Sequence, residues 1–181
     1  IDADGRELQP LDFADLDEAI DAMRGGGIEA VALCFLHAHA NPAHEEAAAR
    51  RIAQALPAAY LSVSSRVLPQ VRFYERTSTT VLNASVGPIL ANYLDRLLAR
   101  LAQARWPGTL RIMQSNGGVA SAERVRALAA STLLSGPAAA PAAGLAWMTP
   151  HRRRSFITVD MGGTSFDASL VLDGQPAVTT A

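Results

Sequence analysis

Lysine is absent from this chain, although sixteen of its 181 residues are basic, so all sixteen are arginine. A Walker-type phosphate loop, a lysine Schiff base and a Ser–Lys catalytic pair each require a lysine. None of them can be built from these residues. The formal net charge of −1 gives no electrostatic reason to expect a nucleic acid as a partner.

Cysteine and long apolar runs are also scarce. Cys34 is the only cysteine, so no internal disulfide can form, and its place in the apolar run 31–36 predicts a small buried side chain. No stretch is long and apolar enough to cross a membrane. We therefore expect a cytoplasmic protein, kept in a reducing compartment and without membrane contact.

The first third of the chain alternates between helical and strand patterns. Asp12 predicts a helix cap, and the glycines at 25–27 stop that helix. The apolar run 28–36 predicts a buried strand. A second helix starts at the Asn-Pro pair 41–42, and 60–64 predicts a second strand. This alternation predicts an α/β layer with a mostly parallel sheet.

The middle of the chain is less regular. Residues 66–76 predict a polar connection because they show no apolar period. Apolar residues at spacings of three and four then predict a helix over 82–101 that starts or kinks near Pro88. Residues 110–114 predict a short strand followed by a turn, and 121–130 predicts a capped helix.

A glycine turn between two strand patterns is the strongest functional signal. Gly162 and Gly163 follow a strand over 156–159, and glycine leaves backbone N–H groups open to a phosphate. The hydroxyls of Thr164 and Ser165 add donors that can rotate toward phosphate oxygens. An ordinary hairpin is the alternative, but the strand before the turn and the polar residues around it favour phosphate binding.

Two carboxylates flank this turn, and we expect both to be catalytic. Asp160 is placed to hold a water bound to Mg²⁺ or to orient the attacking group. Asp167, at the start of the return strand, is expected to play one of the same two roles or to stabilise the hairpin. An anion site beside acidic residues makes chemical sense mainly when a cation bridges them, so the pattern predicts Mg²⁺ with ATP as the cofactor.

Ser135 and Gly136 form a second candidate phosphate contact. They precede a segment of small residues over 138–144, and a helix start can present free N–H groups to an anion. By itself, a simple helix cap is the commoner explanation. Pro141 is expected to shorten or bend this helix.

Three histidines and one dense polar group are harder to assign. His37, His39 and His44 invite a metal site, but no cysteine or acidic partner stands at a zinc-like spacing, and ordinary loop histidines explain them better. The polar residues over 72–77 fit an interface or contacts between lobes as well as they fit catalysis.

Five segments, in one order along nearly the whole chain, carry a family resemblance. They are 35–45 (FLHAHANPAHE), 74–84 (YERTSTTVLNA), 113–118 (MQSNGG), 134–139 (LSGPAA) and 160–165 (DMGGTS). Together they resemble the ATP-dependent hydantoinase/5-oxoprolinase family, in particular its ATP-handling A-type subunit. Five segments in sequence are far more specific than any one of them.

The resemblance implies a partial actin-like (ribonuclease H-like) ATPase fold of the acetate-kinase type, with ATP between two lobes. The hairpin from Asp160 to Asp167 would be the second of two phosphate-binding hairpins. Members use ATP to open a cyclic amide or imide ring of the hydantoin or 5-oxoproline type, often with a second, B-type subunit. A ketone carboxylase subunit, a non-catalytic activator ATPase and a structural piece that binds nothing alone remain alternatives.

The resemblance also implies a division of the chain. Residues 1–115 would complete the first α/β lobe, residues 116–154 would cross between the lobes as helices, and residues 155–181 would begin the second lobe. The chain would then be a central fragment of a longer hydrolase, inactive alone because half of its ATP site lies elsewhere.

Overall fold

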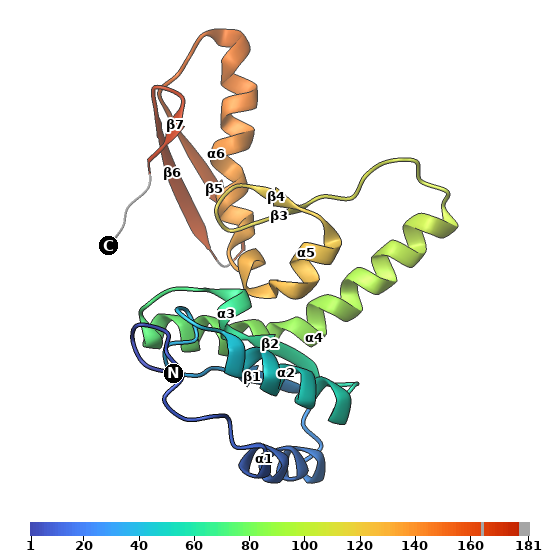
Figure 1. Cartoon of the computed structure of the whole chain (residues 1–181). Coiled ribbons are helices and arrows are strands. Elements are labelled where there is room, and N and C mark those ends of the chain that lie inside the picture. Colours follow the sequence, from blue (N-terminus) through green and yellow to red (C-terminus); the bar gives the residue numbers. More distant parts are fainter. Residues whose placement is uncertain (164, 178–181) are drawn as a thin grey trace. The chain divides into compact units, whose positions relative to one another are not determined.

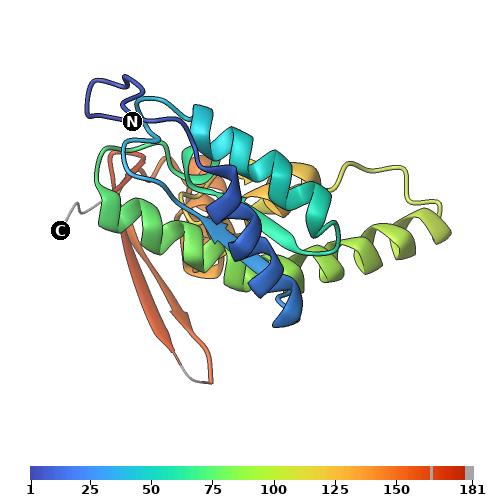
Figure 2. The same ribbon diagram turned by 60° about the horizontal axis from the view of Figure 1, so that its bottom comes forward.

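The computed structural model describes residues 1–163 and 165–177, which divide into two units that are presented separately (Figures 1 and 2). Unit 1 comprises residues 1–107 and 126–130, and unit 2 comprises the described residues of 108–125 and 131–181. The helices are α1 (Phe13–Gly25), α2 (Ala43–Ala55), α3 (Ser64–Val67), α4 (Phe73–Gln103), α5 (Ala122–Ala127) and α6 (Ser135–Met148), with the 3₁₀ turns η1 (Ala129–Thr132) and η2 (Thr149–His151). The strands are β1 (Ala30–Leu33), β2 (Tyr60–Val63), β3 (Ile112–Met113), β4 (Val119–Ala120), β5 (Phe156–Met161), β6 (Phe166–Leu172) and β7 (Gln175–Pro176).

The centre of unit 1 is a two-stranded parallel sheet. Strands β1 and β2 pair from Ala30 opposite Tyr60 to Leu33 opposite Val63. Helices α1 and α2 run side by side over one face (Figure 2), and α4 contacts both strands. The buried apolar cluster on the α1–α2 side consists of Ile20, Val31, Leu33, Ala48, Ala49, Ile52 and Val63. The predicted α/β layer with parallel strands is therefore confirmed.

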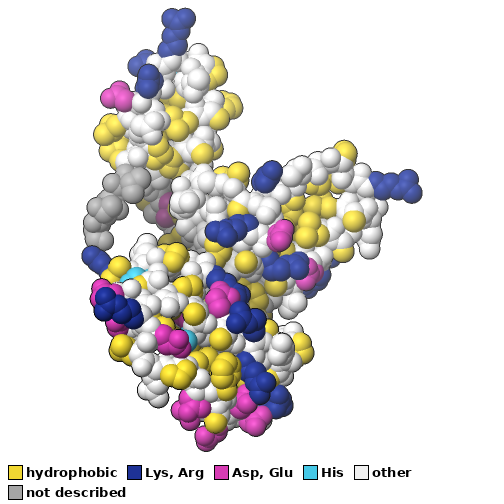
Figure 3. Space-filling model, viewed as in Figure 1, with side chains coloured by type: hydrophobic (Ala, Val, Ile, Leu, Met, Phe, Trp, Pro, Cys, Tyr) yellow, Lys and Arg dark blue, Asp and Glu magenta, His cyan; other side chains and the backbone are white. Residues whose placement is uncertain are grey.

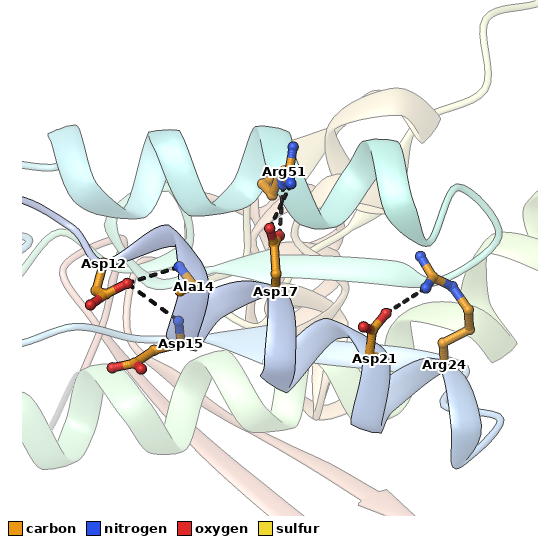
Figure 4. A network of polar contacts seen from close by, with 7 residues as sticks. All are labelled: Asp12, Ala14, Asp15, Asp17, Asp21, Arg24 and Arg51. Carbon is orange, nitrogen blue, oxygen red and sulfur yellow. Dashed lines mark hydrogen bonds and ion pairs between the residues drawn. The ribbon is translucent and has the colours of Figure 1, made fainter.

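Helix α1 begins as the sequence predicts. Asp12 is its N-cap, and the Asp12 carboxylate accepts hydrogen bonds from the backbone N–H groups of Ala14 at 2.8 Å and Asp15 at 3.4 Å (Figure 4). These bonds satisfy donors that have no partner inside the helix. Farther along, Arg51 on α2 donates to both carboxylate oxygens of Asp17 at 2.7 and 2.6 Å, which ties the two helices together.

Strand β1 is shorter than the apolar run that predicts it. The prediction covers residues 28–36, whereas β1 ends at Leu33. The backbone N–H of Phe35 donates to Glu45, and the Phe35 carbonyl accepts from Arg76, each at 2.8 Å. Side chains therefore take the backbone groups that a longer strand would use in its ladder. The second predicted strand, by contrast, is correct to within one residue.

Helix α4 starts at Phe73, inside the segment predicted to be a polar connection, so that prediction is wrong. The apolar pattern missed the first turns because their buried face is polar: Arg76, Thr80 and Asn83 are all buried. Pro88 lies within the helix and does not start it. Despite its 31 residues, α4 is not apolar enough to span a membrane, and neither is any other helix in the described part of the chain.

Asn83 determines where the helix after Ser121 stops. The sequence predicts this helix to about residue 130, but α5 ends at Ala127 and the turn η1 follows. The Asn83 amide donates to the Ala127 carbonyl at 3.1 Å, and its oxygen accepts from the Ala130 N–H at 3.0 Å. Because this side chain takes backbone groups on both sides of the break, the helix cannot continue through them.

Unit 2 begins with a small hairpin. Strands β3 and β4 pair antiparallel through Ile112 opposite Ala120 and Met113 opposite Val119, so the strand predicted over 110–114 is shorter than expected. The turn between them falls where the Asn-Gly-Gly sequence predicts it, with Gly117 at a φ of +78°. That backbone conformation strongly favours glycine.

Helix α6 runs through Pro141, so the prediction that Pro141 shortens it is wrong. Proline removes one helical hydrogen bond, but packing against the sheet offsets that loss. A Cβ built on Gly144 would lie 2.5 Å from the Phe156 ring and 2.7 Å from the Thr158 methyl group. The small residues of α6 therefore allow close contact with β5.

A three-stranded antiparallel sheet, in the order β5-β6-β7, completes unit 2. Asp173 and Gly174 connect β6 to β7 with φ values of +48° and +80°, which confirms the predicted Asp-Gly hairpin turn. One face of the sheet lies on α6 and buries Val171. Apolar side chains are common on the visible surface of unit 2 (yellow in Figure 3), and the other face of the hairpin exposes Ile157, Val159, Met161, Phe166, Leu170 and Leu172.

Candidate phosphate-binding site

The predicted site residues meet at one end of the β5–β6 hairpin. The two strands pair from Phe156 opposite Val171 to Met161 opposite Phe166. At the turn, the Gly162 N–H donates to the Ser165 carbonyl at 3.0 Å, so this donor closes the turn. Thr164, which the sequence also assigned to phosphate binding, lies outside the described residues.

The two turn glycines are not explained by the shape of the turn. Neither has a positive φ in the structure. A Cβ built on Gly163 would meet no heavy atom within 4 Å, and one on Gly162 would lie 3.9 Å from Ser165. Among the described residues, neither a positive φ nor crowding therefore demands glycine at these positions. The backbone of this turn is open to close approach on the sides that the described residues leave free.

Asp160 and Asp167 lie directly opposite each other in the ladder. Asp160 is exposed and Asp167 is half-buried. Like charges at directly opposed positions of an antiparallel pair destabilise it. Carboxylate oxygens are the ligands that Mg²⁺ prefers, and a divalent cation would offset the repulsion between them. The donor set of this pair therefore fits a magnesium ion.

A groove between α6 and β5 leads to Asp160. It has a volume of about 530 Å³ and is predominantly apolar. Thr158 lines it beside Asp160, and the Thr158 hydroxyl is buried with no hydrogen-bond partner among the described residues. Its walls are formed by Ala140, Ala143, Gly144, Trp147, Met148, Phe156, Ile157, Thr158, Val159 and Asp160. The groove therefore combines an apolar wall with one unused hydroxyl and one carboxylate.

Sequence reasoning did not assign Thr158 to the site. The signal was present, because residues two apart on a strand share a face, so Thr158 and Asp160 had to lie on the same side of β5. Trp147 could not be placed in the same way. Its contact with the groove depends on how α6 packs on the sheet, and the small-residue pattern of α6 does not specify that packing.

Ser135 and Gly136 are the first two residues of α6. The N-cap of this helix is Leu134, which has a φ of +61° and makes no side-chain capping bond. Ser135 is therefore not the cap that the simpler explanation required. The start of a helix carries partial positive charge and suits an anion. Both residues belong to unit 2, as does the hairpin.

The three histidines lie in unit 1, away from the hairpin in the sequence. His44 Nε2 is 2.8 Å from Glu7 Oε1, and the rings of His37 and His39 have centroids 6.0 Å apart. Among residues 1–163 and 165–177, no group of three or more His, Cys, Asp or Glu side chains is arranged to hold a metal ion.

Comparisons with known proteins place the chain in a family. A model described as hydantoinase/oxoprolinase matches residues 76–181, and a model of the hydantoinase/oxoprolinase N-terminal region matches residues 1–56. The chain belongs to the hydantoinase/oxoprolinase family, which confirms the resemblance seen in the sequence.

Several relatives have recorded activities. The chain is 42% identical to the caprolactamase subunit alpha of Pseudomonas jessenii, over 96% of this chain and 25% of that protein. It is 29% identical to the 5-oxoprolinase of Saccharomyces cerevisiae, over 94% of this chain and 13% of that one. It is 26% identical to the acetophenone carboxylase gamma subunit of Aromatoleum aromaticum, over 97% of this chain and 24% of that one. The chain thus spans about a quarter or less of these relatives.

Two solved structures share the mixed α/β fold. The crystal structure of the ATP-dependent caprolactamase from Pseudomonas jessenii matches with a TM-score of 0.81 and 41% identity, over 94% of this chain and 25% of that one. A nucleotide-free acetone carboxylase structure matches with a TM-score of 0.84 and 21% identity, over 96% of this chain and 25% of that one.

Proposed function

We propose that this chain is part of an ATP-dependent enzyme that opens a cyclic amide or imide ring. The observation that carries the proposal is the 42% identity to a caprolactamase subunit alpha over 96% of the chain. The 29% identity to a 5-oxoprolinase extends the substrate class to other small cyclic amides. We infer a ring substrate of the caprolactam, hydantoin or 5-oxoproline type.

The β5–β6 hairpin is the proposed phosphate site. Asp160 and Asp167 would hold Mg²⁺, directly or through water, and Gly162, Gly163 and Ser165 would face the phosphates. The open space at the glycines and the opposed carboxylates support this assignment. ATP supplies a phosphoryl group, which can make an unreactive amide carbonyl susceptible to water.

The first turn of α6 is the proposed second phosphate contact. Ser135 and Gly136 would donate from their backbone N–H groups, and the serine hydroxyl would add a third donor. The absence of a side-chain cap at Leu134 supports this role. Thr164 keeps its proposed place in the site on sequence alone.

The wider architecture is also proposed. An actin-like ATPase fold would place a second phosphate-binding hairpin opposite this one, with the chain divided near residues 115 and 154. The mixed α/β fold shared with the ATP-dependent caprolactamase supports the proposal of an ATPase fold. Names such as subunit alpha and gamma among the relatives support a second, B-type subunit as partner. We further propose a cytoplasmic location.

A ketone carboxylase subunit is the second candidate function. The 26% identity to an acetophenone carboxylase gamma subunit over 97% of the chain favours it. The higher identity to the caprolactamase supports ring opening as the first candidate.

The two functions differ in their products. The polypeptide that contains this chain would be purified with and without its second subunit, and then supplied with Mg-ATP and either caprolactam, 5-oxoproline and hydantoin or acetophenone with bicarbonate. We expect ring-opened amino acid and ADP from at least one cyclic amide. A carboxylated ketone without ring opening would establish the carboxylase. ATP hydrolysis at a rate that no organic substrate changes, without ring opening or carboxylation, would establish an activator ATPase.

A further inference from the structure

Arg76 carries a buried positive charge that makes no ion pair within the described part of the chain. The side chain lies on the inner face of α4 and is 1% exposed. Its Nη2 donates to the carbonyl of Phe35 at 2.8 Å, and the guanidinium carbon lies 5.5 Å from the centre of the Phe73 ring. Nε and Nη1 have no hydrogen-bond partner among the described residues.

Arginine cannot become neutral by losing a proton, as other buried basic side chains can. The guanidinium stays charged throughout the pH range of proteins, in contrast to a buried lysine or histidine. A buried charge without a counter-ion is strongly destabilising, and buried polar groups are nearly always paired. The unused N–H groups of Arg76 therefore call for an acceptor that carries negative charge.

Glu45 is the buried acid nearest to Arg76 along the hydrogen-bond network, but its oxygens are already engaged. Glu45 Oε1 accepts from the Phe35 N–H at 2.8 Å and from the Ser64 hydroxyl at 2.6 Å, and Oε2 accepts from the Ser65 N–H at 2.9 Å. No ion pair joins Glu45 and Arg76 within the described part of the chain. Glu45 fixes the loops after β1 and β2, and Arg76 keeps its free donors.

Arg76 lies where α/β proteins hold their ligands. Because β1 and β2 are parallel, the loops after both strands leave the same edge of the sheet, and Arg76 binds the first of these loops through Phe35. Two other buried atoms have no hydrogen-bond partner among the described residues: Nδ1 of His39, in the connection after β1, and the hydroxyl of Ser65, in α3 directly after β2. Unused polar groups thus come from the connection after β1, from α3 after β2 and from α4.

We propose that Arg76 binds an oxyanion, a carboxylate or a phosphoryl group, at the carboxyl edge of the β1–β2 sheet in unit 1. The anion accepts hydrogen bonds from the guanidinium nitrogens that Phe35 leaves free. His39 and Ser65 are the proposed further ligands, because His39 Nδ1 and the Ser65 hydroxyl also have no partner among the described residues. The residues of this site belong to unit 1, whereas the hairpin residues of the proposed nucleotide site belong to unit 2.

Nuclear magnetic resonance of the arginine side chains tests the proposal on the whole 181-residue chain. The Nε–H resonances of ¹⁵N-labelled protein would be followed during titrations with sodium acetate and with sodium phosphate, and sodium chloride would serve as the ionic-strength control. We expect a saturable shift of the Arg76 resonance with acetate, phosphate or both, beyond the chloride effect. Acetate alone would identify the source as a carboxylate, and phosphate alone would identify a phosphoryl group.

Two matched variants separate a site from a general salt effect. Arg76→Lys keeps a donor for Phe35 but loses the guanidinium, and we expect it to weaken the anion response by at least about tenfold. Arg100→Lys changes an exposed arginine on the same helix and should leave the Arg76 response unchanged. If Arg76→Lys fails to fold, the wild-type titration decides alone, with Arg76 assigned through its own backbone. An Arg76 resonance that moves no more with acetate or phosphate than with chloride would overturn the proposal.

Discussion

Asn83 binds Ala130 across a break in helical structure. The Asn83 Oδ1 accepts from the Ala130 N–H at 3.0 Å, while the amide nitrogen donates to the Ser62 hydroxyl at 2.9 Å. Asn83 and Ser62 are buried, and Ala130 is half-buried. One side chain on α4 thus joins the edge of β2 to the segment 126–130, which returns to unit 1 from elsewhere in the sequence.

Asn83→Ala is expected to lower the free energy of unfolding by about 2–4 kcal/mol, because the buried Ser62 hydroxyl and the backbone groups of Ala127 and Ala130 lose their hydrogen bonds to Asn83 at once. Chemical denaturation measures the change. Asn92→Ala is the control, since Asn92 is an exposed residue of the same helix and its loss should cost less than about 0.5 kcal/mol. Equal stability of the two variants would contradict the structural role of Asn83.

Gly87 is predicted to tolerate no side chain. A Cβ at this position would lie 2.1 Å from Tyr60 Cε1, and the Tyr60 hydroxyl is itself held by the carbonyl of Arg126. Gly87→Ala should therefore destabilise the protein by about 1–3 kcal/mol despite the higher helix propensity of alanine. At Gly25, where a Cβ meets nothing within 4 Å, the same change should be neutral or stabilising. The midpoints of thermal unfolding of the two variants test this prediction. A Gly87→Ala midpoint equal to that of Gly25→Ala would contradict the contact with Tyr60.

Glu45 and Glu46 are adjacent but should respond differently to amidation. Glu45 accepts three hydrogen bonds in the interior, and Glu45→Gln replaces one acceptor oxygen with an NH₂ group that faces donors, at a cost of about 2–4 kcal/mol. Glu46 pairs with Arg66 at the surface, so Glu46→Gln should cost less than about 1 kcal/mol. The midpoints of chemical denaturation of Glu45→Gln and Glu46→Gln measure the two losses of stability. A similar loss in both would mean that Glu45 is not buried as described.

The pair Asp17–Arg51 predicts a pH dependence at the acid end. Hydrogen bonds from Arg51 hold the pKa of Asp17 below its ordinary value of 3.8. The contribution of this pair is therefore present above the unfolded pKa and is lost as the pH falls through the lower, folded pKa. Arg51→Gln should raise the Asp17 pKa toward 3.8, as followed by carboxyl-carbon NMR, whereas Arg50→Gln should not. An Asp17 pKa that is the same in all three proteins would refute the contact between α1 and α2.

The sequence predicted those elements whose signals are local. The Asp12 cap, the parallel strand pair, the Asp173-Gly174 turn and the β5–β6 hairpin each follow from a few neighbouring residues. The opposition of Asp160 and Asp167 could also be anticipated, because a short glycine turn between strands limits the possible registers.

The features that the sequence could not predict depend on contacts between distant residues. The start of α4 was missed because Arg76 and Asn83 bury polar groups where an apolar pattern was sought. Asn83, which lies far from α5 in the sequence, also determines where α5 ends. The passage of α6 through Pro141 depends on its packing against β5. A pattern of neighbouring residues in the sequence does not show which distant residues make these contacts.

The central claim is that Asp160 serves a Mg-ATP site. The most direct test is Mg-ATP-dependent ring opening by the full polypeptide with its second subunit, comparing Asp160→Asn with Asp173→Asn. Asp173 lies in the β6–β7 turn of the same sheet, where its positive φ suits asparagine, so that change should preserve the fold and the activity. We predict that Asp160→Asn lowers turnover by about a hundredfold or more while the circular dichroism spectrum is unchanged. Turnover by Asp160→Asn equal to that of Asp173→Asn would contradict the claim.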